Sequence, residues 1–304
     1  MYHSYSPTDL STGQLHGTLL TGIAPRPIAF VSTIDAQGRV NLSPFSFFNI
    51  FGSNPPLLIF SPARRVRDNT TKHTLDNLHE VGECTVNIVD YAMVEQMSLA
   101  STEYDRGVNE FIKSGLTEVK SELVAAPRVG ESPLSMECKI QQIIATGDQG
   151  GAGNLVIAEV IKVHLRADAC GDNQLLDADK LDLVGRMGGS YYVRATGDAL
   201  FEIPKPLRTK GIGVDQLPDH VRGSEILSGN DLGRLGNLAQ APTADQILAE
   251  QECLGLSPDD QPTELIDFLA EDNGLSLTQK LHQYAKELIA KGEAERALAV
   301  LFAV

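Results

Sequence analysis

The sequence predicts a mainly β domain, folded as an antiparallel sheet or barrel, followed by a helical C-terminal appendage. Strand-like segments follow one another through the first two thirds of the chain, with few helical segments between them. That order favours an antiparallel sheet or barrel over alternating strand–helix–strand units. After about Pro204 the composition changes, and motifs typical of helix starts follow.

Six segments have the composition of β-strands. The first is apolar and β-branched and ends at a turn-forming cluster, residues 35–38. The second alternates polar and apolar side chains, as a half-buried strand does. A Gly-rich loop at residues 147–153 joins the last two. The predicted strands cover residues 28–33, 40–45, 57–60, 84–89, 136–145 and 155–165.

Two helices are predicted within the β region. In the first, Leu75, Leu78 and Val81 are spaced three residues apart and share one face. Thr71 or Thr74 is expected to cap its start, and Gly82 is expected to close its end. A second, shorter helix is predicted over residues 92–100.

The tail is predicted to be a separate unit, so we divide the chain into residues 1–205 and 206–304. Residues 204–206, 211–213 and 223–236 have the composition of an extended connection. Capping boxes at Thr243 and Ser276 then predict two helix starts, and the helical stripe that follows is broken at Gly292. The appendage is expected to pack on the barrel or on a partner subunit.

Composition excludes several classes of function. The 304 residues include 25 basic and 40 acidic side chains, a net charge of −15. Binding to a nucleic acid backbone is therefore not expected. No signal peptide is recognised at the start, and no apolar run reaches the roughly 20 residues that span a bilayer. Four separated cysteines and no metal-ligand spacing of histidines predict a reduced, cytoplasmic protein without a metal site or membrane contact.

Polar side chains recur where the predicted strands and the first helix begin or end. A helix start with free amides, hydroxyl groups and a lysine suits an anion such as phosphate, and phenylalanines suit the covering of a planar ring. Together they predict a phosphorylated aromatic cofactor. Taken singly, the hydroxyls are more often helix caps, the arginines a solvated loop and the phenylalanines core. The candidates are Asn41, Ser43, Phe45, Ser46, Ser61, Arg64, Thr71, Lys72 and Thr74.

The order of these motifs resembles the flavin reductase-like, FMN-binding split-barrel family. The resemblance rests on PRPIAFVST at 25–33, GRVNLSPFSFFN at 38–49 and NPPLL at 54–58. It continues in KHTLDN at 72–77 and GECTVN at 82–87, and GRMGGSYY at 185–192 is similar to the closing motif of the family. It covers roughly residues 15–200, and the tail carries no motif that we assign.

The resemblance implies a six-stranded Greek-key barrel that forms a homodimer and holds FMN near the subunit interface. By motif position, Asn41, Ser43 and Ser46 would line the ring and ribityl side. Thr71, Lys72 and Thr74 would hold the phosphate, with Ser61 and Arg64 close by. Gly189 and Tyr191 would approach the ring. FAD is less favoured but stays open, because a phosphate site alone does not exclude an adenylate beyond it.

The resemblance also implies an oxidoreductase that passes hydride from NADH or NADPH to flavin and electrons on to a second acceptor. The flavin carries the chemistry, so no catalytic side chain is assigned. A flavin-binding electron-transfer protein, reduced by a protein partner and without NAD(P)H turnover of its own, is the alternative. A third interpretation is a barrel that has lost its flavin and serves as an interaction module.

Overall fold

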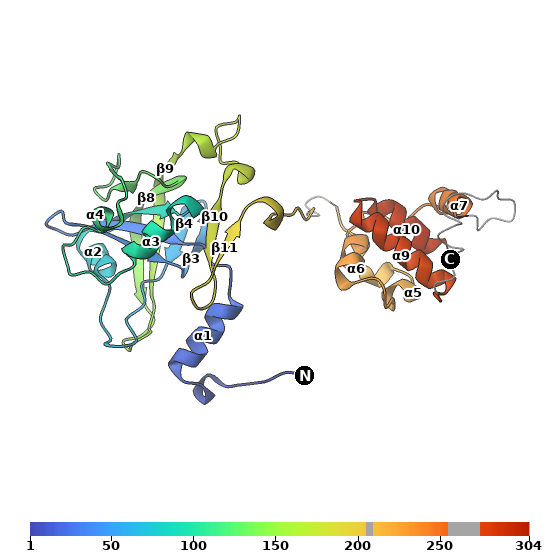
Figure 1. Ribbon diagram of the computed structural model, residues 1–304, viewed down its shortest axis with the longest axis horizontal. Helices are drawn as coiled ribbons and strands as arrows, with labels where there is room; N and C mark the ends of the chain where they lie inside the picture. The colour runs from blue at the N-terminus through green and yellow to red at the C-terminus, as the bar shows by residue number, and fades with distance from the viewer. Residues whose placement is uncertain (205–208, 255–273, 304) are drawn as a thin grey trace. The chain divides into compact units, whose positions relative to one another are not determined.

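The chain folds into two compact units, Met1–Phe201 and Glu202–Val304, as Figure 1 shows. The structure, a computed structural model, describes residues 1–204, 209–254 and 274–303. The first unit is mainly β and the second is helical. The predicted boundary, between residues 205 and 206, lies outside the described residues.

One antiparallel sheet of seven strands forms the first unit, in the order β2-β1-β5-β8-β9-β4-β3. The six predicted strands are present, and β3 is the addition to the expected count. Its side chains are mostly exposed, so no pattern of burial marks it in the sequence. The strands are β1 (Ala29–Ile34), β2 (Val40–Phe45), β3 (Phe48–Ser53), β4 (Pro56–Phe60), β5 (Glu83–Ile88), β8 (Leu134–Ala145) and β9 (Asn154–Leu165).

The two edge strands of this sheet are joined by a very short link. Strand β2 ends at Phe45 and β3 begins at Phe48, so only Ser46 and Phe47 connect them. A link of this length holds the two edges of the sheet close together, and the sheet must curl into a barrel to allow it. Pro44 fits on β2 because an edge strand has a side that needs no backbone donor.

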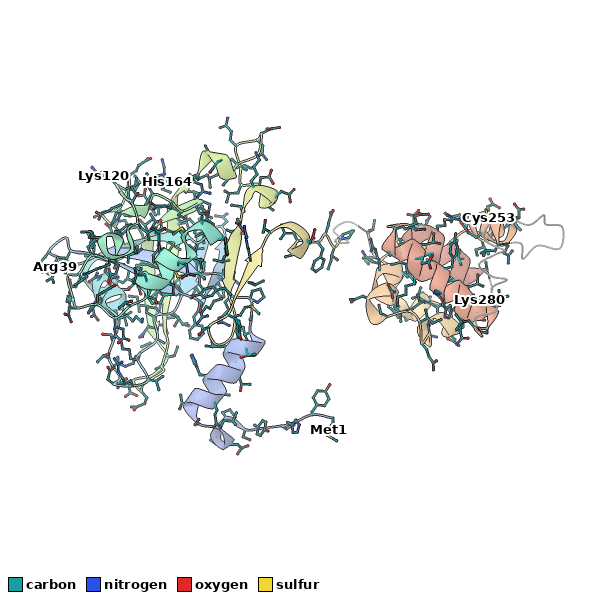
Figure 2. All side chains as sticks on the ribbon, in the orientation of Figure 1. Met1, Arg39, Lys120, His164, Cys253 and Lys280 are labelled. Atoms are coloured by element: carbon teal, nitrogen blue, oxygen red, sulfur yellow. The ribbon has the colours of Figure 1, made fainter. Side chains whose placement is uncertain are left out.

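Strand β1 separates two apolar clusters because its successive side chains point to opposite faces. Val31 lies in the cluster that includes Leu75 and Leu78 of α2. Phe30 lies in the other, which is covered by Met97 of α3 and by residues of α4. The helices of the first unit are α1 (Thr12–Gly22), α2 (His73–Val81), α3 (Val94–Ala100) and α4 (Glu110–Ser114). Side chains fill the barrel throughout (Figure 2), with Arg39 at the turn between β1 and β2.

The helix predictions hold in outline and differ at the ends. Helix α2 closes at Gly82 as predicted, but its N-cap residue is Lys72 and not Thr71 or Thr74. The helix predicted over 92–100 consists of a 3-10 turn, Tyr91–Met93, followed by α3. Helix α1 was not predicted, although Ser11 and Gln14 form a capping box, because it buries no residue and so lacks an apolar stripe.

Two short antiparallel pairs complete the first unit. Strands β10 (Leu183–Arg186) and β11 (Tyr192–Ala195) form a hairpin, and β6 (Glu118–Val119) pairs with β7 (Arg128–Val129). Arg26 exchanges backbone hydrogen bonds with Arg186, which attaches the hairpin to the chain just before β1. The loop between β10 and β11 carries Gly189 and Tyr191.

The second unit is a group of helices around an aliphatic core. Its helices are α5 (Asp219–Arg222), α6 (Gly229–Gly236), α7 (Ala244–Cys253), α9 (Leu277–Ala290) and α10 (Ala294–Phe302). Thr243 and Ser276 cap α7 and α9, and a turn at Gly292 separates α9 from α10, as predicted. The expectation of an extended connection over 223–236 was wrong. Ser228 caps α6 with Asp231, and burial of Leu235 holds that helix on the core.

Candidate functional site

A polar cleft lies where β2, the start of α2 and the segment after α3 meet. Strand β2 contributes alternate side chains, Asn41 and Ser43, which point to the same face. Its Leu42 amide points away from β1 and donates to the carboxylate of Glu110 at 2.9 Å. The cleft is lined by Asn41, Ser43, Arg65, Lys72, His73, Thr74, Ala100, Ser101, Thr102, Glu103, Tyr104 and Glu110.

The start of α2 opens onto this cleft without a side-chain cap. Lys72 is the N-cap residue and has extended backbone dihedral angles. Its side chain accepts no hydrogen bond from the first amides of the helix. The first amides of a helix have no intrahelical acceptor, and the helix dipole places positive charge there. The helix start therefore offers donors and positive potential to an anion in the cleft.

Lys72 adds a formal positive charge at the same place. Its side chain is half-buried, and among the described residues its ammonium group has no recorded hydrogen bond or ion pair. Burial, and then the positive charge of Arg65, lower the pKa of Lys72 below 10.5. A partly buried cation without an anionic partner is costly, so this position suits an anionic ligand.

Arg65 is fixed by the loop that follows β4. Its guanidinium donates to the hydroxyl of Thr70 at 2.8 Å and to the carbonyl of Thr71. Its Nε donates to the carboxylate of Glu103 at 2.8 Å. The Gly-rich hairpin between β8 and β9 supports this loop, because the Gly151 amide donates to the Arg64 carbonyl at 3.0 Å.

Two of the predicted phosphate and ring contacts, Asn41 and Thr74, are paired with one another. The Asn41 amide donates to the Thr74 hydroxyl at 2.9 Å, and both side chains are buried. Thr33 accepts from Asn77 of α2 at 3.0 Å. These bonds tie the first turn of α2 to β1 and β2, so Asn41 and Thr74 hold the helix start in place.

Three further candidates lie in the loop before α2 and at the end of β4, with their polar groups engaged. Thr71 donates to Asp76 at 2.9 Å. Ser61 is buried and accepts from the Asn154 amide at 3.1 Å. Arg64 donates to the side chain and the carbonyl of Asn69, both at 2.6 Å. None of these three side chains lines the cleft in the structure.

Phe45 lies in the core and does not line the cleft. Its side chain is buried, and its ring is 5.7 Å from that of Phe60 between centroids. The prediction took Phe45 together with its exposed aromatic neighbours, because residue type alone does not separate a core ring from a surface ring. Alternation along β2 places Phe45 in the barrel interior.

Ser46 and the β10–β11 loop, which carries Gly189 and Tyr191, are linked through Arg26. The buried Arg26 guanidinium donates to Ser46 at 3.5 Å and to the Met187 carbonyl, in the β10–β11 loop, at 3.0 Å. Gly189 in that loop has a φ of +58°, which favours glycine. Tyr191 is 78% exposed. Arg26, which the sequence reasoning quoted only within a motif, joins these segments.

Sequence reasoning missed the acidic side of the cleft. Glu110 is buried, and burial raises its pKa above 4.5. It stands at the start of α4, a helix that was not predicted. Glu103 follows α3 and reaches Arg65 across the cleft. Neither residue occurs in a motif near β2 or α2, so only the fold brings them to the site.

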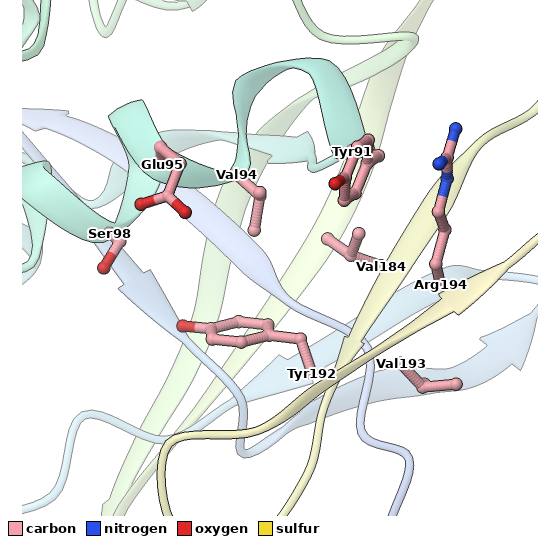
Figure 3. A pocket seen from close by; sticks show the side chains of 8 residues that line it. All are labelled: Tyr91, Val94, Glu95, Ser98, Val184, Tyr192, Val193 and Arg194. Carbon is pink, nitrogen blue, oxygen red and sulfur yellow. The ribbon is translucent and has the colours of Figure 1, made fainter.

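A second cleft lies between α3 and the β10–β11 hairpin (Figure 3). Figure 3 shows Tyr91, Glu95 and Ser98 on one side and Tyr192 on the other, with Val184 between them. The guanidinium of Arg194 stacks over the Tyr91 ring at 4.0 Å and that of Arg186 over the Tyr192 ring at 4.7 Å. The walls of this cleft are therefore aromatic and its rim is polar.

Within residues 1–204, 209–254 and 274–303, no group of three His, Cys, Asp or Glu side chains is placed to hold a metal ion. Over the same part of the chain, none of the helices has both the length and the apolar character needed to cross a membrane.

Comparison with known proteins places this geometry in a family. A family model described as the flavin reductase like domain matches residues 21–181, just over half of the chain. An uncharacterized protein of Aquifex aeolicus is 35% identical over 189 residues, which cover 62% of this chain and 94% of the relative.

Two solved structures are similar over the same share of the chain. Nitrilotriacetate monooxygenase component B from Bacillus cereus is 29% identical, with a TM-score of 0.62, over 67% of this chain and 99% of its own. The 2-nitrobenzoate 2-nitroreductase of Pseudomonas fluorescens is 26% identical, with a TM-score of 0.60, over 69% of this chain and 100% of its own.

Proposed function

The chain belongs to the family of flavin reductase-like domains, and on that premise we propose that it is an FMN-binding oxidoreductase. In this proposal it passes hydride from NADH or NADPH to flavin and electrons on to a second acceptor. The split-barrel fold and the similarity to a monooxygenase component and a nitroreductase support oxidoreductase chemistry. The choice of FMN rests on the cleft itself.

The observation that carries the proposal is the anion site at the start of α2. Lys72 brings an unpaired, half-buried ammonium group to a helix start that has no side-chain cap. Arg65 lies on the same cleft, and it lowers the pKa of Lys72, as a nearby positive charge does. A phosphate monoester is the anionic end of FMN, and it would satisfy the helix amides and the lysine together.

The residues around the cleft would have separate tasks. Lys72 and the first amides of α2 would bind the phosphate, while Asn41 and Thr74 keep that helix start against the barrel. Ser43 and Ser46 would orient the ring along β2, with Gly189 and Tyr191 close to its other side. Once bound, the flavin supplies hydride acceptance and onward electron transfer.

The spectrum of the purified protein tests the proposal. We expect oxidised-flavin absorption that is bleached rapidly when NADH or NADPH is added without oxygen. A flavin spectrum that neither nucleotide bleaches would contradict the proposed turnover and favour an electron-transfer protein reduced by a partner. Colourless protein that does not take up added FMN would contradict flavin binding.

Sedimentation of the same sample tests the proposed homodimer. Apolar Ile50 and Phe51 on β3 are each 63% exposed, which supports an interface there. A protein that sediments as a monomer at micromolar concentration would contradict it.

A further inference from the structure

The carboxylate of Glu103, which lines the cleft, is paired with two arginines. It accepts hydrogen bonds from Nε of Arg65 at 2.8 Å and from Arg67 at 2.9 Å. Arg65 lines the same cleft as Lys72, whose ammonium makes no ion pair among the described residues but feels the negative charge of Glu103. An anion supplied by the protein therefore pairs directly with one cation of the site and acts on the neighbouring cation through its charge alone.

Glu103 is not needed to orient Arg65. The Thr70 hydroxyl and the Thr71 carbonyl already accept hydrogen bonds from the Arg65 guanidinium, and its side chain is only 18% exposed. The Glu103 side chain is 44% exposed, on the segment after α3, and exposed ion pairs contribute little to folding stability. The pair therefore has little structural role.

We propose that Glu103 is an internal anion that competes with the phosphate of a flavin for Arg65, and that it thereby sets the selectivity between phosphorylated and unphosphorylated flavin. The inference rests on the proposed function and names a specificity-determining residue for it. A phosphate monoester carries almost two negative charges and three acceptor oxygens, so it can displace a single carboxylate from the guanidinium. Hydrogen bonds from Arg67 and then Arg65 lower the pKa of Glu103, so it is charged at neutral pH.

Competition between Glu103 and the flavin phosphate for Arg65 affects only the phosphate end of the ligand. FMN carries the phosphate, and riboflavin has the same ring and ribityl chain without it. Removing the charge of Glu103 should strengthen FMN binding and leave riboflavin binding unchanged. The ratio of the two dissociation constants therefore isolates what happens at Arg65 from any change along the ring.

The test is a titration of the flavin-free full-length chain with FMN and with riboflavin, followed by quenching of flavin fluorescence at low salt. Glu103→Gln should bind FMN about two- to fivefold more tightly than the wild type, the range for an ion pair near a surface. Its affinity for riboflavin should not change. Glu103→Ala removes the hydrogen bonds as well as the charge and should give at least the same gain.

The matched control is Glu225→Gln. Glu225 is exposed in the helical unit and makes no ion pair among the described residues. This variant changes the net charge by the same amount as Glu103→Gln, so it should leave both affinities unchanged. An equal gain in FMN affinity for Glu225→Gln would overturn the inference, because the effect would then come from overall charge.

The other outcomes separate this inference from the proposed function. If wild-type protein prefers FMN over riboflavin and Glu103→Gln keeps that preference unchanged, the phosphate site stands and the competition is refuted. Weaker FMN binding by Glu103→Gln would also refute it, because Glu103 would then help Arg65 to bind. If the wild type binds FMN and riboflavin equally, both the phosphate site and the inference fail.

Discussion

The two units of this chain differ in what their interiors contain. The barrel unit buries polar side chains among its strands, and these make hydrogen bonds to neighbouring segments. Asn87, for example, donates to the Phe30 carbonyl at 2.9 Å and accepts from the Val129 amide at 3.0 Å. The helical unit is held by an aliphatic core that includes Leu281 and Leu298.

This difference has a functional meaning. A buried polar group is costly unless it is paired, so a barrel that keeps many of them fixes the loops to which they are bonded. At the cleft, the bond from Asn41 to Thr74 and the bond from the Leu42 amide to Glu110 hold its walls in this way. The family match, residues 21–181, also lies within the barrel unit. We therefore assign the proposed chemistry to the barrel unit.

A buried histidine, His282, is paired with the half-buried His220 in the helical unit. Ser224 Oγ accepts from the amides of Ile226 and Leu227, so its own proton is available to His282 Nδ1 at 2.8 Å. His282 then carries its proton on Nε2 and donates to His220 Nδ1 at 3.1 Å. The two rings stack with centroids 5.3 Å apart. This chain of bonds requires a neutral His282.

The largest expected effect separates the stability of the two units. Leu281→Ala removes a fully buried side chain of the helical core, and it should cost about 2–5 kcal/mol of unfolding free energy there. Flavin binding should not change. Phe60→Ala is the matched change in the barrel core and should cost about 3–5 kcal/mol and weaken flavin binding as well.

Calorimetry and flavin titration of both variants check this prediction. If Leu281→Ala abolished flavin binding, the assignment of the chemistry to the barrel unit alone would be wrong.

A smaller effect is expected for the proposed phosphate site. Lys72→Met should weaken FMN binding about ten- to a hundredfold, because a hydrogen bond to a charged group contributes about 1.5–3 kcal/mol. Riboflavin binding should not change. Lys120→Met, an exposed lysine labelled in Figure 2, is the control and should bind FMN as the wild type does. Unchanged FMN affinity of Lys72→Met would remove Lys72 from the site.

The smallest expected effect is the dependence of folding stability on pH. The pH range over which stability is lost should differ between the two units. Burial and then the neighbouring His220 lower the pKa of His282 below 6.5, so the unfolded chain takes up the proton first as the pH falls. The helical unit is therefore fully stabilised above pH 6.5 and loses stability below it, down to the lowered pKa.

The barrel has a buried carboxylate that responds only at lower pH. Burial alone would raise the pKa of Glu137, but hydrogen bonds from the Glu122 amide, from His164 and from two further amides lower it to about 2. Glu137 thus contributes stability above pH 4.5 that is lost between pH 4.5 and about 2.

Hydrogen exchange of the full-length chain, corrected for intrinsic rates, compares the two units at about one pH unit above and below 6.5. Protection of α9 should fall, and that of β5 should fall less. The barrel has one histidine of this kind, His73 at the start of α2, and although burial lowers its pKa too, its side chain is only half-buried. In His282→Gln the loss in α9 should disappear. An equal loss of protection in both units would contradict the comparison.

Local signals in the sequence were enough for six strands of the main sheet and for the helices α2, α7 and α9. Alternation along β2 and the helical spacing of Leu75 and Leu78 are properties of consecutive residues, and so is the capping box at Ser276. Elements without such a signal were missed, among them α1, β3 and α4. Helix α1 buries none of its side chains, and β3 leaves most of its side chains exposed.

The candidate site was predictable in part. The start of α2 and Lys72 follow from a helix pattern preceded by polar residues. The identity of the N-cap residue did not follow from the sequence, because Thr71 and Thr74 are equally good caps by residue type. Asn41 pairs with Thr74, and residue type alone did not indicate that contact between β2 and α2.

By itself the sequence determined six of the seven strands of the main sheet, the helix that begins after Lys72, and the family. These depend on residues close together in the chain, whose periodicity and backbone preferences act before any tertiary contact forms. The tertiary structure alone decided that Glu103 and Glu110 face Arg65 and Lys72 across one cleft, and that Phe45 belongs to the core. The physical reason is that charges far apart in the chain interact only once folding brings them within a few ångströms of one another, where water screens them less.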